Sequence, residues 1–109
     1  MGRLVLLSSM ALAAIVAFAA SAQEVGQPAQ GQTLARQICA ECHAVTKGAA
    51  ASPNPRAPAF EALASTPGMT RAALFAALQT SHRTMPNLVL QGDDMANVVA
   101  YILSLKSGS

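Results

Sequence analysis

The chain has 109 residues, of which 52% are hydrophobic, 4% aromatic and 11% charged, and its formal net charge is +2. A chain of this length forms one small domain, which excludes a multidomain enzyme and a polytopic membrane protein. Its two cysteines allow at most one internal disulfide, which excludes a disulfide-dense scaffold. Basic residues are scattered singly, which argues against a nucleic-acid partner. So small a core, poor in aromatic side chains, indicates that a cofactor completes it.

Residues 1–22 have the pattern of a cleaved signal peptide. Arg3 gives a positive start, residues 4–20 are apolar apart from two serines, and residues 20–22 (Ala-Ser-Ala) match a small-x-small cleavage site. The alternative is an uncleaved membrane anchor, for which this stretch lies at the lower limit of length. We therefore expect a periplasmic mature chain with no membrane span after signal removal.

After the signal peptide we expect a flexible lead-in over residues 23–30 and then one domain over residues 31–109. The lead-in contains Gly and Pro and has no periodicity. The first helix is predicted over residues 32–40, where Leu34 and Ile38 are four residues apart and share a face.

The middle of the chain alternates between short helices and proline-marked loops. Three prolines make residues 47–58 a loop. A short helix is predicted over residues 59–64, and Thr70 is a suitable N-cap for a helix over residues 71–79. Residues 81–91 have no regular pattern.

The last helix has the clearest pattern in the chain. Asp93 and Asp94 are expected in its first turn and Lys106 in its last, where each charge interacts favourably with the helix dipole. No segment has the pattern of a strand. The predicted class is all-α, with three to four helices and loops packed around a bound group. The apolar stripe of the last helix consists of Met95, Val98, Ile102 and Leu105, with Tyr101 beside it.

Residues 39–43 read Cys-Ala-Glu-Cys-His, a C-x-x-C-H motif typical of c-type haem attachment. Two thiols three residues apart, Cys39 and Cys42, can add to the two vinyl groups at one edge of a porphyrin. The imidazole of His43 then lies under the iron as its proximal ligand. The sequence predicts one haem c, bound covalently through both cysteines. Because such attachment follows export, the signal peptide and the motif support each other.

Other uses of these residues stay open. A dithiol site of the thioredoxin type also uses C-x-x-C, but it expects a preceding strand in a βαβ pattern. A structural zinc site needs four ligands, and the chain has two cysteines and two histidines in total, with His82 far from the motif. A plain disulfide would leave His43 unexplained.

From about residue 31 to residue 105 the chain resembles the class I cytochromes c, small monohaem electron carriers with a cytochrome c fold. Gly31 lies where the family places a small residue so that the first and last helices cross closely, and Tyr101 matches the aromatic residue that packs against it. The segment at residues 57–60 (Ala-Pro-Ala-Phe) resembles the family's Gly-Pro-x-Leu. The resemblance implies that the carbonyl of Pro58 accepts the second ring N–H of the haem histidine.

The resemblance also matches Met85, followed by Pro86, to the distal methionine that binds the iron opposite His43. His82, Met69, Met95 and water are alternative sixth ligands; we expect Met95 in the core and Met69 at the surface or rim. The apolar side chains expected as haem walls are Phe60, Leu63, Leu74, Phe75, Leu78, Leu88 and Leu90.

These features imply a soluble periplasmic carrier of single electrons rather than an enzyme, acting as a monomer. The expected partners are redox proteins: a donor dehydrogenase or cytochrome complex and an acceptor oxidase or reductase. The near-neutral charge predicts docking through an apolar rim with mild salt dependence. The alternative function is a haem-based ligand-binding or sensing protein with a labile sixth position.

Overall fold

The computed structural model describes residues 26–49, 51–80 and 84–107, and within these ranges the chain is helical with no strand. The predicted all-α class is confirmed. The expected signal peptide lies outside the described residues. The helices, in chain order, are α2 (Pro28–Leu34), the π-helical η1 (Ala35–Cys39), α3 (Phe60–Ser65), α4 (Arg71–Gln79) and α5 (Asp94–Ser104).

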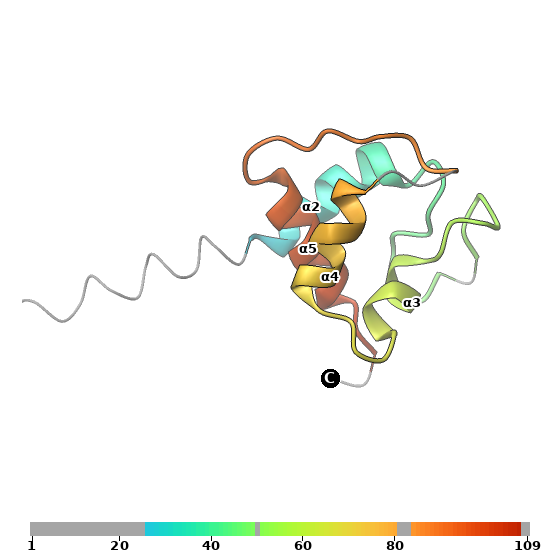
Figure 1. Ribbon diagram of the computed structural model, residues 1–109. Coiled ribbons are helices and arrows are strands. Elements are labelled where there is room, and N and C mark those ends of the chain that lie inside the picture. Colours follow the sequence, from blue (N-terminus) through green and yellow to red (C-terminus); the bar gives the residue numbers. More distant parts are fainter. Residues whose placement is uncertain (1–25, 50, 81–83, 108–109) are drawn as a thin grey trace, which may run out of the picture.

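Helix α5 organises the fold, because α2, α3 and α4 all pack against it (Figure 1). Its predicted apolar stripe is buried at Val98, Ile102 and Leu105, whereas Met95 is half-buried, and the buried surface is wider than predicted, since α2 covers a second side of the helix. In addition to Val98, Tyr101, Ile102 and Leu105, the buried residues of this region include Asn97, Val99 and Ala100.

The crossing of α2 over α5 depends on Gly31. A Cβ atom at this position would collide with the backbone carbonyl of Asn97 and would crowd the Cβ of Tyr101. Glycine is the residue that permits this approach because it has no side chain. The expected contact between Gly31 and Tyr101 is therefore confirmed.

The chain segment before Gly31 is held more firmly than expected. Gly26 lies against the backbone of α5, and the N–H of Gln27 donates to Oδ1 of Asn97 at 2.8 Å. Helix α2 follows directly, with Pro28 at its first position, where the missing N–H costs nothing. The prediction of a flexible lead-in is wrong for residues 26–30. Their backbone lies close to the backbone of α5, and this approach holds the segment without the help of an apolar stripe.

Helices α3, α4 and α5 lie close to their predicted positions. Helix α4 spans the predicted residues, and the Thr70 hydroxyl caps it by accepting the N–H of Ala73 at 3.1 Å. Helix α3 is shifted by one residue from the predicted range. Helix α5 ends at Ser104, so Lys106 follows the helix instead of lying in its last turn, and that prediction is wrong. The loop before α3 is present as predicted.

Candidate functional site

The C-x-x-C-H motif forms one helical turn at the end of η1. The N–H groups of Cys42 and His43 both donate to the carbonyl of Cys39, at 3.2 and 2.9 Å. Residues three and four apart on a helical turn share a face. This turn therefore gathers both thiols and the imidazole on one side of the chain. Both cysteines are half-buried, and they are not joined to each other by a disulfide.

That side of the chain faces a cavity of about 410 Å³, a volume within the range of small-molecule and cofactor sites. Its walls come from η1 and the motif turn after it, from the loop before α3, from α3, Met69 and α4, and from the segment 84–88 together with Ile102 of α5. All six site residues predicted from the sequence line it, namely Cys39, Cys42, His43, Pro58, Phe60 and Met85. The structure thus brings these residues together, whereas their roles toward a cofactor stay predictions.

The imidazole of His43 is oriented by the loop before α3. Its Nδ1 lies 2.7 Å from the carbonyl oxygen of Pro58. A carbonyl can only accept, so Nδ1 carries the proton and Nε2 keeps the lone pair that a metal would take. The ring also contacts Phe60, with centroids 5.4 Å apart, and Phe60 in turn contacts Tyr101 at 6.4 Å. The hydrogen bond expected from the resemblance is therefore present.

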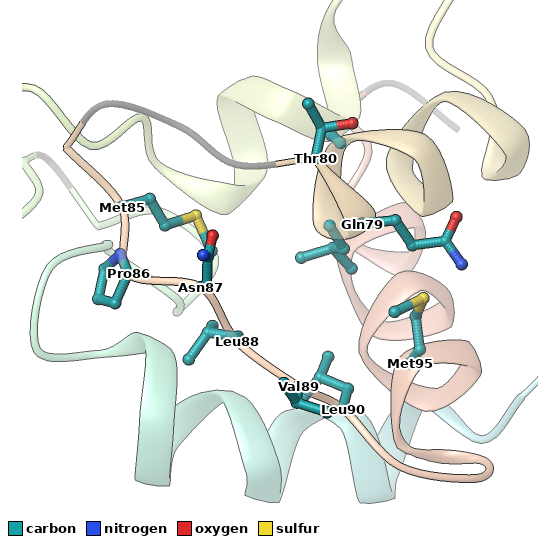
Figure 2. Close-up of a pocket in the computed structure, with 11 residues that line it drawn as sticks. Gln79, Thr80, Met85, Pro86, Asn87, Leu88, Val89, Leu90 and Met95 are labelled. Carbon is teal, nitrogen blue, oxygen red and sulfur yellow. The ribbon is translucent and has the colours of Figure 1, made fainter.

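Met85 approaches the same cavity from the irregular segment between α4 and α5. A second cavity, of about 360 Å³, lies along this segment, and Met85 lines both cavities. Figure 2 shows Met85 on the segment and Met95 on α5, at opposite sides of the second cavity. Met69, expected at the surface or rim, is half-buried and lines the first cavity. His82 lies outside the described residues.

A family model described as cytochrome c oxidase, cbb3-type, subunit III matches residues 26–102. The chain belongs to this family. The resemblance to small monohaem c-type cytochromes is thereby confirmed, and the match extends to Gly26, before the predicted domain boundary. A cytochrome c domain binds haem and transfers electrons. Comparison with curated proteins and with solved structures gave no match.

The cytochrome's predicted haem walls are largely present. Five of the seven line the first cavity: Phe60, Leu63, Leu74, Leu78 and Leu88. The prediction is wrong for Phe75, whose ring lies 4.5 Å from the guanidinium carbon of Arg71, and for Leu90, which lines the second cavity. The structure adds Ile38 and Ile102 to the walls; both were assigned to helix faces, but the sequence did not show which cavity those faces border.

The cytochrome's cavity is apolar inside and charged at its edge. Its charged lining residues are Glu41 and Arg56, and both are exposed. Burial raises the pKa of the Cys39 thiol. The nucleophilic thiol of a dithiol oxidoreductase instead has a lowered pKa. The environment of Cys39 therefore does not match that alternative chemistry.

The donor set of the cytochrome fits an iron porphyrin. Two thiols, an oriented imidazole and a thioether line one apolar cavity, and these are the groups that c-type haems use for attachment and axial ligation. Among the described residues no three His, Cys, Asp or Glu side chains gather as a metal site, so these residues do not build the four-ligand zinc alternative. In the described ranges no helix is both long and apolar enough to cross a bilayer.

Proposed function

We propose that the protein is a periplasmic one-electron carrier, with haem c attached through Cys39 and Cys42 and ligated by His43 and Met85. The observation that carries the proposal is the shared cavity: both thiols, the Pro58-oriented imidazole and the Met85 thioether line the same apolar space. The chain's C-x-x-C-H motif and export pattern support covalent attachment after secretion.

The choice of Met85 over Met69 as sixth ligand follows from their surroundings. Both methionines line the first cavity, but Met69 packs against the buried core cluster, and its side chain fills space there. Met85 lies on an irregular segment bordered by cavities, and its side chain has room to turn toward the metal. Pro86 restricts the backbone immediately after it.

The haem iron would supply the one-electron redox couple, and the chain would control access to it. His43 and Met85 together would fill both axial positions, which keeps substrates from the metal and limits rearrangement on electron transfer. A thioether ligand raises the reduction potential relative to an all-nitrogen site. The apolar walls exclude water from the interior. This arrangement favours a carrier over an enzyme.

Docking would use apolar side chains near the cavity rather than charge. Ile38, beside Cys39, is 40% exposed, and Val89, on the segment that carries Met85, is 78% exposed. Both are large hydrophobic residues in contact with water, and such residues mark protein contact sites when they gather. We propose redox proteins as partners, namely a donor dehydrogenase or cytochrome complex and an acceptor oxidase or reductase. Their association with the monomer should depend weakly on salt.

A ligand-binding or sensing function is the second candidate. The observation that favours it is the second cavity beside Met85, which gives the side chain somewhere to go if it leaves the iron. A sensor would bind carbon monoxide rapidly in its untreated ferrous form, whereas a carrier with Met85 bound would react slowly.

Absorption spectroscopy of three proteins tests the proposal. The ferric wild type should show the weak far-red band of iron–sulfur ligation, and Met85→Ala should lose it. Met69→Leu, which alters the other methionine of the cavity, is the matched control and should keep the band. Loss of the band in Met69→Leu alone, or rapid carbon monoxide binding by the wild type, would contradict the assignment of Met85 in a carrier.

A further inference from the structure

The peptide groups that flank His43 are held by the loop before α3. The carbonyl of Cys42, on one side of His43, accepts the N–H of Asn54 at 3.1 Å. On the other side, the N–H of Ala44 donates to the Ser52 hydroxyl at 2.9 Å, and the carbonyl of Ala44 accepts the N–H of Phe60 at 2.9 Å. The backbone on both sides of the histidine is thus bonded to this loop and to the first residue of α3.

The Ser52 bond is the part of this arrangement that depends on a side chain. Ala44 is 7% exposed, and Ser52 is half-buried, so the Ala44 N–H has limited access to water. A buried N–H that loses its partner is costly, and the local backbone shifts to find another. Removing the Ser52 hydroxyl would therefore move Ala44 and, with it, the adjacent His43.

The same loop carries the acceptor for the histidine ring. Pro58 lies six residues after Ser52, and its carbonyl is the 2.7 Å partner of His43 Nδ1. Ser52 fixes the backbone next to the histidine, and Pro58 fixes the ring. The two contacts together set the length of the hydrogen bond between Nδ1 of His43 and the carbonyl oxygen of Pro58. Neither Ser52 nor Pro58 supplies an atom that would bind the metal.

We propose that Ser52 is a positioning residue that tunes the redox midpoint through His43. The inference rests on the proposed function, because it requires His43 to bind the iron. A short hydrogen bond from Nδ1–H to a carbonyl makes the imidazole a stronger donor, which favours ferric over ferrous iron. Loss of the Ser52 hydroxyl loosens that bond and favours the ferrous state.

The test is redox titration of the haem-loaded full-length protein and three variants. Ser52→Ala should shift the ferrous-to-ferric ratio by about threefold toward ferrous, which is a rise of ~30 mV for one electron. Ser52→Thr keeps a hydroxyl and should have the wild-type potential. Ser65→Ala is the matched control: it also removes a serine that accepts a backbone N–H, from Ser107 at 3.1 Å, but this N–H is not next to His43, as that of Ala44 is.

Amide hydrogen exchange on the wild type gives a second measurement that needs no variant. The Ala44 amide should exchange slowly, because its N–H is bonded and buried. Rapid exchange of that amide would overturn the inference, as would an unchanged potential in Ser52→Ala or an equal shift in Ser65→Ala. Those outcomes leave a haem protein and so leave the proposed function intact. Protein without haem in every variant and in the wild type would overturn both.

Discussion

The two sides of the cavity are built in different ways. On the His43 side, the loop before α3 forms hydrogen bonds to the ring and to the neighbouring peptide groups, and Tyr101 donates from α5 to the carbonyl of Val45. On the Met85 side, an irregular segment runs between two cavities with exposed Val89 upon it. The His43 side is fixed by hydrogen bonds, whereas the Met85 side has open space around the methionine side chain.

This difference indicates a division of roles between the two regions. Under the proposed function, the His43 side would define where the iron lies, because the Pro58 carbonyl orients the imidazole. The Met85 side borders two cavities, so under the proposed function its thioether would be exchanged or lost with less effect on the rest of the fold. Removing His43 should therefore cost the cofactor, changes to the hydrogen bonds around it should alter stability or the redox midpoint, and changes on the Met85 side should alter ligation alone.

The largest expected effect comes from removing the two proposed iron ligands, His43 and Met85, in turn. His43→Ala should lower the yield of haem-loaded protein by about tenfold or more, because the proximal ligand and its oriented environment are lost. Met85→Ala should keep the covalent haem and open the sixth position. The measurement is haem content per polypeptide in matched preparations. Equal haem loss in the two variants would contradict the division between the two sides.

Gly31→Ala tests the helix crossing on which both sides depend. The added methyl group would meet the backbone of α5 at Asn97, which cannot turn aside as a side chain can. We expect a net loss of about 1–3 kcal/mol in the free energy of unfolding, even though alanine favours a helix over glycine. Denaturant titration measures it.

Ala29→Val is the control for that experiment, since it adds methyl groups at an exposed position of the same helix. We expect a change below about 0.7 kcal/mol, the range of helix propensity alone. A Gly31→Ala protein as stable as the wild type would show that the crossing tolerates a side chain.

Tyr101→Phe tests the hydrogen bond that Tyr101 donates on the His43 side of the cavity. The variant keeps the ring that contacts Phe60 but removes the hydroxyl that donates to the buried carbonyl of Val45. We expect a loss of about 1–2 kcal/mol in the free energy of unfolding, because that carbonyl loses its partner. Thermal or denaturant unfolding checks it, and an unchanged stability would mean that water replaces the hydroxyl.

The smallest effect concerns acid stability. Hydrogen bonds from the Gly48 N–H at 2.6 Å and the Ser107 hydroxyl at 2.8 Å, with attraction from Lys47, lower the pKa of Glu61. A lowered folded pKa contributes stability above the unfolded value, 4.5, and this contribution is lost as the pH falls through the folded pKa. Glu61→Gln should therefore weaken the acid dependence of unfolding. The same dependence in variant and wild type would show that Glu61 contributes nothing to it.

Much of the fold could be predicted because local chemistry and overall packing agree. Thr70 is a good N-cap, and α4 follows it; the proline-rich loop before α3 could not be helical. The spacing of the motif alone places Cys39, Cys42 and His43 on one face of a helical turn. The contact of Gly31 with Tyr101 came from the family resemblance rather than from periodicity.

The features that could not be predicted depend on contacts between distant segments. Gln27 is held by Asn97, 70 residues away, and no local pattern signals this bond. In the sequence Ser52 is likewise an ordinary loop serine, and only the folded structure places its hydroxyl at the N–H of Ala44. The second cavity, which Leu90 and Met95 line, depends on the path of an irregular segment.

Covalent attachment of haem to Cys39 and Cys42 can be read directly from a haem stain after denaturing electrophoresis. The exported wild-type protein, made in cells that mature c-type haem, should keep its haem stain after denaturing electrophoresis, with a mass increased by one haem. A Cys39→Ala/Cys42→Ala double variant should lose the stain under the same conditions. Wild-type protein that runs without stain, or a stain that survives in the double variant, would contradict the account.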